Sequence, residues 1–232
     1  MIENKPLILN IETATNVCSV ALTKGENILN YVECRESNAH SKMLTTLLQD
    51  IFYNTYYSIS DLDAVAASKG PGSYTGLRIG VSSAKGLAYA RNIPLIGVET
   101  LQVLAFAARK KYPNKYYLPM IDARRMEVYT SLYDSELNQL KSISADIVDR
   151  DIYADYAAKE IVLIGDGAEK CKKILTNKRY VLDKDIYLSA ADMTTLSYEK
   201  FLRKEFEDVA YFEPYYLKEF IAIKSKVKGL YN

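Results

Sequence analysis

The segment Lys69–Arg91, KGPGSYTGLRIGVSSAKGLAYAR, constrains the fold of this chain more than any other. It follows an apolar run at residues 64–67, which predicts a buried strand, and turns on Gly-Pro-Gly at 70–72. A helix then begins near Ser73 or Thr75, since either side chain can accept hydrogen bonds from free amides. Such a turn resembles a phosphate cradle, but glycines also simply supply the backbone angles of tight turns. The segment therefore predicts an α/β unit and leaves a phosphate site open.

The predicted helix after this turn is rich in small residues. At about 100° per residue, its polar side chains fall in one narrow arc, formed by Arg78, Ser82, Lys85 and Tyr89. The rest of the circumference is small or apolar, roughly twice the width that a helix needs to cover a sheet. We therefore expect this helix to be packed from two sides, by another helix of this chain or by a partner protein.

Composition excludes several classes of protein. The chain of 232 residues carries 30 basic and 29 acidic side chains, which does not fit a free-standing nucleic-acid binder. Cys18, Cys34 and Cys171 have no metal-ligand or CxxC spacing and predict free buried thiols in a reducing compartment. No signal peptide and no apolar run of transmembrane length is present. These features predict a cytoplasmic protein without a membrane partner.

The first hundred residues predict the order β-β-β-α-β-α-β. Strands are expected at residues 7–12, 17–23, 28–34, 64–67 and 95–98, the first three as an antiparallel meander. The first helix is expected between Ser41 and Asn54, with one apolar stripe at helical spacing: Leu44, Leu47, Leu48, Ile51 and Phe52.

A second series of helices and strands is expected after Glu99. The expected elements are a helix at 101–111, a hairpin of strands at 116–122 and 126–133, strands within 140–148 and at 161–164, a helix to about residue 175 and a helix at 191–206. No Pro/Gly/Ser linker separates the halves. We therefore expect touching lobes with a boundary near Thr100: residues 1–100 carry the partner-binding helices, and residues 101–232 form a second lobe whose end can pack back on the first.

Several blocks together resemble the TsaB family, also called YeaZ. They are LNIETATNVCSVAL, KGPGSYTGLRIGVSSAKGLA, IPLIGVETL, MIDARRMEVYTSLYD and, at 213–218, EPYYLK, with Lys218 where the family usually has Arg. The resemblance covers nearly the whole chain. It implies an α/β, two-lobed actin-like or ribonuclease H-like (ASKHA) fold, each lobe a mixed sheet with flanking helices. The element order read from the residues is compatible with this fold and does not single it out unaided.

The resemblance also implies a function. TsaB is a non-catalytic subunit that activates TsaD, which transfers a threonylcarbamoyl group to N6 of adenosine 37 in tRNAs reading codons that begin with A. Further implied partners are the ATPase subunit TsaE and, when TsaD is absent, a second copy of the chain. Contact with tRNA would occur only through the complex. No cofactor of its own is implied, although ATP or ADP at the subunit junction stays open.

A metal site like that of the sister subunit TsaD is excluded by composition. TsaD binds its metal through His-x-x-x-His on a helix, whereas the matching helix here begins with His40 and has Leu44 in the second position. His40 is the only histidine of the chain, so two imidazoles cannot share one helical face. We interpret it as a polar residue near a helix start.

An ATP-dependent phosphotransferase or ATPase of the actin-like superfold is the alternative function. Such enzymes hold phosphates on a first hairpin with an Asp and a glycine-rich turn, whereas residues 11–16 read IETATN, without glycine. Glu12 and Asp122 either face one cleft as a carboxylate pair or simply accept hydrogen bonds from turn amides, and the second interpretation is favoured. A degenerate nucleotide site would comprise Glu12, Thr13, Gly70, Gly72, Asp122 and Gly165.

Two helices have apolar surface to spare for a partner, and in the resembled family the corresponding pair meets TsaD. The expected interface residues are Leu44, Leu47, Leu48, Ile51, Gly76, Ile79, Gly80, Ser83, Gly86 and Ala90. The alternative is that both helices only cover their own sheet. A weaker hypothesis places Lys69, Arg78, Arg124 and Arg125 on a tRNA-facing surface of the assembled complex.

Overall fold

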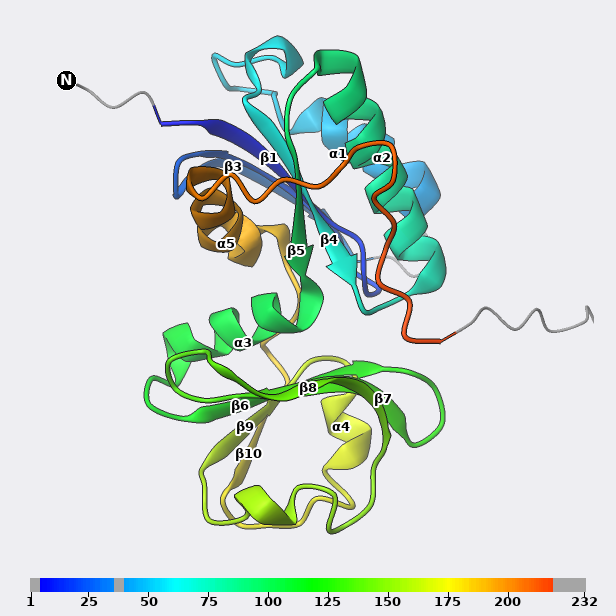
Figure 1. Ribbon diagram of the computed structural model, residues 1–232, viewed down its shortest axis with the longest axis vertical. Helices are drawn as coiled ribbons and strands as arrows, with labels where there is room; N and C mark the ends of the chain where they lie inside the picture. The colour runs from blue at the N-terminus through cyan, green and yellow to red at the C-terminus, as the bar shows by residue number, and fades with distance from the viewer. Residues whose placement is uncertain (1–4, 36–39, 219–232) are drawn as a thin grey trace, which may run out of the picture.

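The computed structural model describes residues 5–35 and 40–218, which form two lobes, each built on a five-stranded sheet (Figure 1). The first sheet has the order β3-β2-β1-β4-β5. Its strands are β1 (Leu7–Glu12), β2 (Cys18–Lys24), β3 (Asn27–Cys34), β4 (Ala64–Gly70) and β5 (Leu95–Glu99). The first three strands pair antiparallel, and β4 and β5 run parallel to β1. Small and branched apolar residues fill β4 because helices cover both faces of this sheet.

Two layers of helices enclose the first sheet. On one face lie α1 (His40–Asp50) and α2 (Tyr74–Arg91), which share an apolar core with β1, β2 and β4. On the other face lie α3 (Thr100–Lys111) and α5 (Ala190–Leu202). Short 3₁₀ turns at Ile59–Asp61 and Ala154–Tyr156 complete the described helical elements.

The second sheet repeats the plan of the first, with the order β10-β9-β6-β7-β8. Its strands are β6 (Tyr116–Asp122), β7 (Glu127–Tyr133), β8 (Gln139–Ile147), β9 (Ile161–Ile164) and β10 (Tyr180–Asp183), with the short helix α4 (Ala168–Cys171) on its outer face. Helix α3 lies between the two sheets (Figure 1). Three antiparallel strands followed by two parallel ones occur in each lobe, so the predicted two-lobed, actin-like α/β fold is confirmed.

After the second sheet the chain returns to the first. Helix α5 packs against β1, β2, β3 and β5, and Ser197 Oγ donates to Asn10 Oδ1 over 2.6 Å. The amide of Ala190 donates to Ser19 Oγ over 2.9 Å. Residues 203–218 then cross the first lobe beside β5 and α2, as the orange and red ribbon of Figure 1 shows.

Three helix ends and one strand differ from the sequence-based expectations. Helix α1 ends at Asp50 rather than near Asn54, which has a left-handed φ of 60°. Helix α4 ends at Cys171, and the chain continues in turns to Leu175. Helix α5 ends at Leu202 rather than 206, since Lys204 is left-handed at φ 56°. Strand β10 was not predicted, because four residues carry little periodicity and its strand form depends on pairing with β9.

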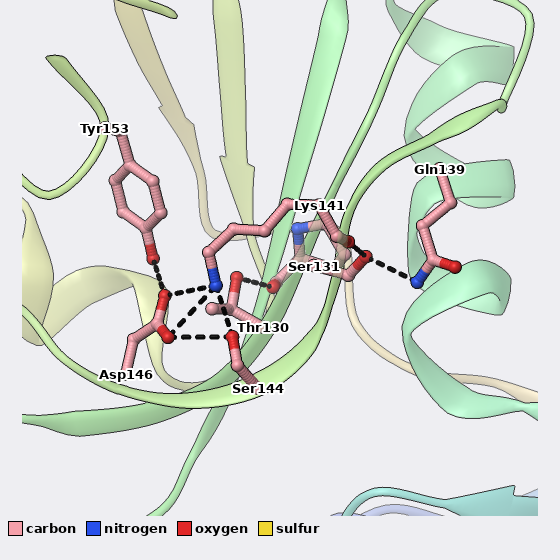
Figure 2. A network of polar contacts seen from close by, with 8 residues as sticks. Thr130, Ser131, Gln139, Lys141, Ser144, Asp146 and Tyr153 are labelled. Carbon is pink, nitrogen blue, oxygen red and sulfur yellow. Dashed lines mark hydrogen bonds and ion pairs between the residues drawn. The ribbon is translucent and has the colours of Figure 1, made fainter. Parts of the chain in front are cut away.

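A buried carboxylate organises one edge of the second lobe (Figure 2). Asp146 on β8 is 8% exposed and lies 3.0 Å from Lys141 Nζ. Ser144 Oγ and the Tyr153 hydroxyl donate to its two oxygens over 2.7 and 3.0 Å. Burial, followed by the neighbouring carboxylate, raises the pKa of Tyr153. Because each oxygen of Asp146 is satisfied, we interpret the network as a tie between β8 and the irregular chain that follows it.

Candidate functional site

Helix α2 begins where the sequence indicated. Ser73 is its N-cap, and the Ser73 side chain accepts a hydrogen bond from the Gly76 amide over 3.3 Å. The helix ends at Arg91 because Asn92 takes a left-handed φ of 51° and its amide bonds back to the last turn. Asparagine tolerates this conformation better than most residues. Local sequence therefore determines both ends of the helix.

The inner side of α2 is packed against the β1–β2 turn. A Cβ atom on Gly76 would lie 2.0 Å from the Thr13 carbonyl oxygen, and one on Gly80 would lie 2.2 Å from Thr13 Oγ1. The Thr13 hydroxyl donates to the Gly76 carbonyl over 2.8 Å. These two glycines are therefore required for close packing within the chain, and they are not available to a partner.

A second side of α2 is covered by residues 207–218, which we call the strap. Lys85 Nζ donates to the carbonyls of Ala210 and Phe212 in the strap over 3.1 and 2.9 Å. The rings of Tyr74 and Tyr216 lie 4.9 Å apart. The strap is an irregular segment of the same chain and lies along the polar arc (Figure 1). It therefore does not supply the packing by another helix or a partner that was expected over the wide small-residue arc.

The remaining surface of α2 is an open stripe of small and apolar residues. Ile79 and Ser83 are half-buried, whereas Gly86 and Ala90 are exposed. Their spacing of four, three and four residues places them on one side of the helix. A Cβ atom on Gly86 would meet nothing within 4 Å. With the half-buried Leu48 of the adjacent α1, this stripe forms the surface that we call the α1–α2 face.

Half of the expected interface residues lie elsewhere. Leu44, Leu47 and Ile51 are 2%, 5% and 0% exposed. Their stripe covers the first sheet, as amphipathic helices usually do. Gly76 and Gly80 face Thr13, as described above. These five residues are therefore unavailable to a partner, and the other five expected residues are those of the α1–α2 face.

The expected nucleotide site of the first lobe is filled by the chain itself. A Cβ atom on Gly72 would lie 2.4 Å from the Ala14 carbonyl oxygen, which also accepts the Ser73 amide over 2.7 Å. Gly70 has a left-handed φ of 107°, and its open side faces the carbonyl of Tyr215 in the strap. Backbone of the same chain thus occupies the space beside the turn glycines. A phosphate cradle would instead leave that space open for a phosphate group.

Glu12 is enclosed behind this turn. It is 0% exposed, and its Oε1 accepts the Ala14 amide over 2.7 Å. Its Oε2 has no hydrogen-bond partner among the residues that the structure describes. Burial raises the pKa of Glu12 to about 7, because the charged form is poorly solvated, and the Ala14 amide offsets this only in part.

Asp122, the second carboxylate of the expected pair, lies in the other lobe. It accepts the Arg124 amide over 2.7 Å and pairs with Lys170. Gly165, at a left-handed φ of 94°, faces the Met120 carbonyl. Both carboxylates therefore accept turn amides, which is the interpretation that the sequence favoured.

No metal-ligand cluster of three or more His, Cys, Asp or Glu side chains occurs in the described part of the chain. The side chain of His40 lies outside the described residues. None of the helices from α1 to α5 is both long and apolar enough to cross a membrane.

Comparisons with known proteins identify the family. The family model described as TsaD, tRNA N6-adenosine threonylcarbamoyltransferase, matches residues 34–222. The tRNA threonylcarbamoyladenosine biosynthesis protein TsaB of Escherichia coli (strain K12) is 33% identical over 226 residues, which cover 94% of this chain and 96% of that protein. This chain belongs to the TsaB (YeaZ) family.

A solved structure and a named transferase are also similar to this chain. A solved structure of YeaZ from Pseudomonas aeruginosa has a TM-score of 0.82 and 26% identity, covering 91% of this chain and 100% of that one. The tRNA N6-adenosine threonylcarbamoyltransferase of Bacillus subtilis (strain 168) is 31% identical over 126 residues, which cover 47% of this chain and 36% of that protein. The sequence similarity thus extends, over about half of this chain, to a named transferase.

Two TsaB sequence blocks meet at the end of the strap. Lys218 of EPYYLK pairs with Glu127 of the DARRMEVY block. The Tyr215 amide donates to the Lys69 carbonyl over 2.6 Å, next to the glycine turn. The sequence blocks did not indicate this contact, because nothing in a local pattern points to a contact between residues so far apart in the chain.

The four basic residues of the suggested tRNA-facing surface have different surroundings. Lys69 lies 3.8 Å from Glu99 Oε1, and the Arg78 guanidinium lies 4.6 Å from the centre of the Tyr74 ring. Arg124 and Arg125 are exposed at the β6–β7 turn, with no ion pair among the described side chains. Two of the four residues are thus engaged with neighbouring side chains, and two are exposed.

Proposed function

We propose that this chain takes part in forming threonylcarbamoyladenosine in tRNA, as a non-catalytic subunit that binds and activates a TsaD-like transferase. Membership of the TsaB family supports the pathway. The observation that carries the binding role is the α1–α2 face, where Gly86 has open space beside it while the other glycines of α2 are filled from within.

The chemistry of this face suits a helical partner. Small residues let two helix backbones approach closely, and the apolar side chains of Leu48 and Ile79 gain from exclusion of water. The Bacillus subtilis transferase is similar to this chain over 126 residues. We infer that the partner presents a comparable pair of helices, so that the interface is a bundle of two helices from each subunit. A second copy of this chain would occupy the same face when the transferase is absent.

The alternative, an ATP-dependent phosphotransferase or ATPase, is less well supported. Its phosphate turn would need the space that Ala14 and Tyr215 occupy beside Gly72 and Gly70. We propose that the chain alone binds neither metal nor nucleotide, and that any ATP or ADP binds at the junction with the transferase. A TsaE-like ATPase and tRNA would join through the complex, in the cytoplasm.

A Gly86→Arg variant tests the proposal. Its side chain can reach water in the free protein but has no room in a helix–helix interface. We expect near-normal thermal stability and at least tenfold weaker binding of the transferase in titration calorimetry, which corresponds to about 1.4 kcal/mol. Thr176→Arg adds the same charge at an exposed turn of the second lobe and should bind normally.

Two outcomes would refute the proposed interface. Unchanged binding by a folded Gly86→Arg protein would show that the α1–α2 face stays in solvent. Transfer of threonylcarbamoyl to tRNA by this chain alone would show that the subunit is itself a catalyst. Titration calorimetry measures the first outcome, and a tRNA modification assay with this chain alone, run beside one with both subunits, measures the second.

A further inference from the structure

Two cysteines lie directly across from each other in the first sheet. Cys18 begins β2, Cys34 ends β3, and the two residues are Cα partners in the antiparallel register. Both are free thiols. Side chains of directly opposed residues project from the same face of a sheet. Here both side chains join the apolar core on the face covered by α1 and α2.

The strand pairing sets a spacing that suits a disulfide bond. Directly opposed residues of antiparallel strands have Cα atoms about 4.5 or 5.5 Å apart, depending on the type of pair. Disulfides join residues whose Cα atoms lie about 4.4–6.8 Å apart. Both kinds of pair fall in this range, so a bond can form without moving the strands. The remaining cysteine, Cys171, is buried in the second lobe.

The two thiols differ in their access to solvent. Cys18 is 1% exposed, whereas Cys34 is half-buried. Burial, followed by the neighbouring Cys34 and Glu12, raises the pKa of the Cys18 thiol to about 12. A small oxidant therefore reaches Cys34 first, and Cys18 is placed to react second, with a sulfur that has already been modified.

We propose that Cys18 and Cys34 form a modification site, a dithiol that a low-molecular-weight disulfide converts into a cross-strand disulfide. The Cys34 thiolate attacks one sulfur of the small disulfide, which forms a mixed disulfide and releases one thiol. The Cys18 sulfur then attacks the Cys34 sulfur while its proton passes to the departing sulfur, and the second small thiol is released. Two protein thiols are oxidised by two electrons, and the small disulfide is reduced to two thiols.

The bond would lock the β2–β3 hairpin. Its position at the end of β3, the strand that precedes α1, brings it close to the helix layer that includes the α1–α2 face. A cross-link restricts local opening of the strands that it joins. Amide hydrogen exchange in β2 and β3 is therefore expected to slow by at least tenfold in the oxidised protein, with little change in the second lobe.

The test incubates the folded full chain with excess oxidised glutathione, measures the intact mass, then unfolds the chain, blocks free thiols with an alkylating reagent and measures peptide masses. Before alkylation we expect a monomer lighter by two hydrogen atoms, and after it a cross-linked peptide pair containing Cys18 and Cys34, with alkylation at Cys171 alone. Cys171→Ser should give the same cross-link. Cys18→Ala, which keeps the buried position apolar, should instead accumulate glutathione on Cys34.

Each contrary result overturns the proposal. A stable glutathione adduct on Cys34 of the wild-type chain would show that Cys18 cannot reach it. Failure to react, while circular dichroism shows the native fold, would show that Cys34 is shielded. Cross-linking that is lost in Cys171→Ser, or that joins two chains, would assign the chemistry to a different pair of thiols.

Discussion

Gly76 and Gly86 lie on the same helix, yet their surroundings are opposite. A Cβ atom on Gly76 would lie 2.0 Å from a backbone carbonyl of the first hairpin, whereas one on Gly86 would meet nothing within 4 Å. Both glycines lower helix propensity by a similar amount. The inner glycine is explained by close packing within the chain. The outer one has no such explanation in the structure, and it is there that we propose a partner.

A wide arc of small residues on one helix can serve several structural roles. One part of α2 lets the β1–β2 turn approach its backbone, another part carries the strap through Lys85, and the stripe of small and apolar residues ending at Ala90 is left open. The same residue types thus serve packing inside the lobe and, in our proposal, packing between subunits. Substitutions at different positions of α2 can test packing inside the lobe and packing between subunits separately.

The largest effect is expected on the inner side. Gly76→Ala places a methyl group against the Thr13 carbonyl, so the hairpin or the helix must shift. We expect a loss of about 3 kcal/mol in the free energy of unfolding, the upper part of the range for overpacked sites. Urea denaturation measures it. A variant as stable as the wild type would remove the contrast between the two glycines.

The buried carboxyl behind the inner side should make stability depend on pH. The pKa of Glu12 is about 7 in the folded protein against an ordinary 4.5, so the folded state retains a proton that the unfolded chain releases. The free energy of unfolding therefore falls as pH rises between these values and then stays level, by roughly 3 kcal/mol in all.

Glu12→Gln should abolish this pH dependence. The stability of the variant minus that of the wild type should therefore be greater at pH 8 than at pH 4. Chemical denaturation at the two pH values gives the difference, with Glu136→Gln as an exposed control. Tenfold or greater loss of tRNA modification in a folded, complex-forming Glu12→Gln protein would contradict a structural role and revive the phosphate-site hypothesis.

The strap side should give an intermediate effect. Lys85→Met keeps the aliphatic stem but removes two hydrogen bonds from an ammonium group to the carbonyls of Ala210 and Phe212. Since Lys85 is partly exposed, we expect the free energy of local opening of the strap to fall by about 1.4 kcal/mol. This loss is measured as roughly tenfold faster amide hydrogen exchange in the strap. Ser82→Ala is the control, because Ser82 is exposed on the same helix and forms no hydrogen bond with the strap among the described residues. Equal exchange in both variants would show that Lys85 does not hold the strap.

The smallest effect is expected on the outer side, and its sign is reversed. Gly86→Ala adds a methyl group in open space and improves helix propensity, so the protein should gain about 1 kcal/mol. This corresponds to a melting temperature higher by roughly 2–4 °C. Differential scanning calorimetry measures the change. A destabilised Gly86→Ala protein would mean that the outer stripe is packed within the chain after all.

Local sequence was sufficient for much of the fold. The glycine turn, the cap at Ser73 and the apolar periodicity of α1 determine element types and most boundaries, because these depend on neighbouring residues. The TsaB sequence blocks added the two-lobed fold, which the element order alone did not single out. For the candidate site, the sequence correctly favoured turn hydrogen bonds for Glu12 and Asp122, whereas its choice of two partner-binding helices stays a prediction.

Only the tertiary structure decided which side of each helix is used. Thr13 meets Gly76 from 63 residues away, and Lys85 meets Phe212 from 127 residues away. Helical periodicity predicts which residues share a side of the helix. The segment that packs on that side in the folded protein, however, is distant in the chain. Which neighbour fills it depends on chain packing that no local pattern encodes, so Leu44 and Gly80 were assigned to a partner although their own lobe buries them.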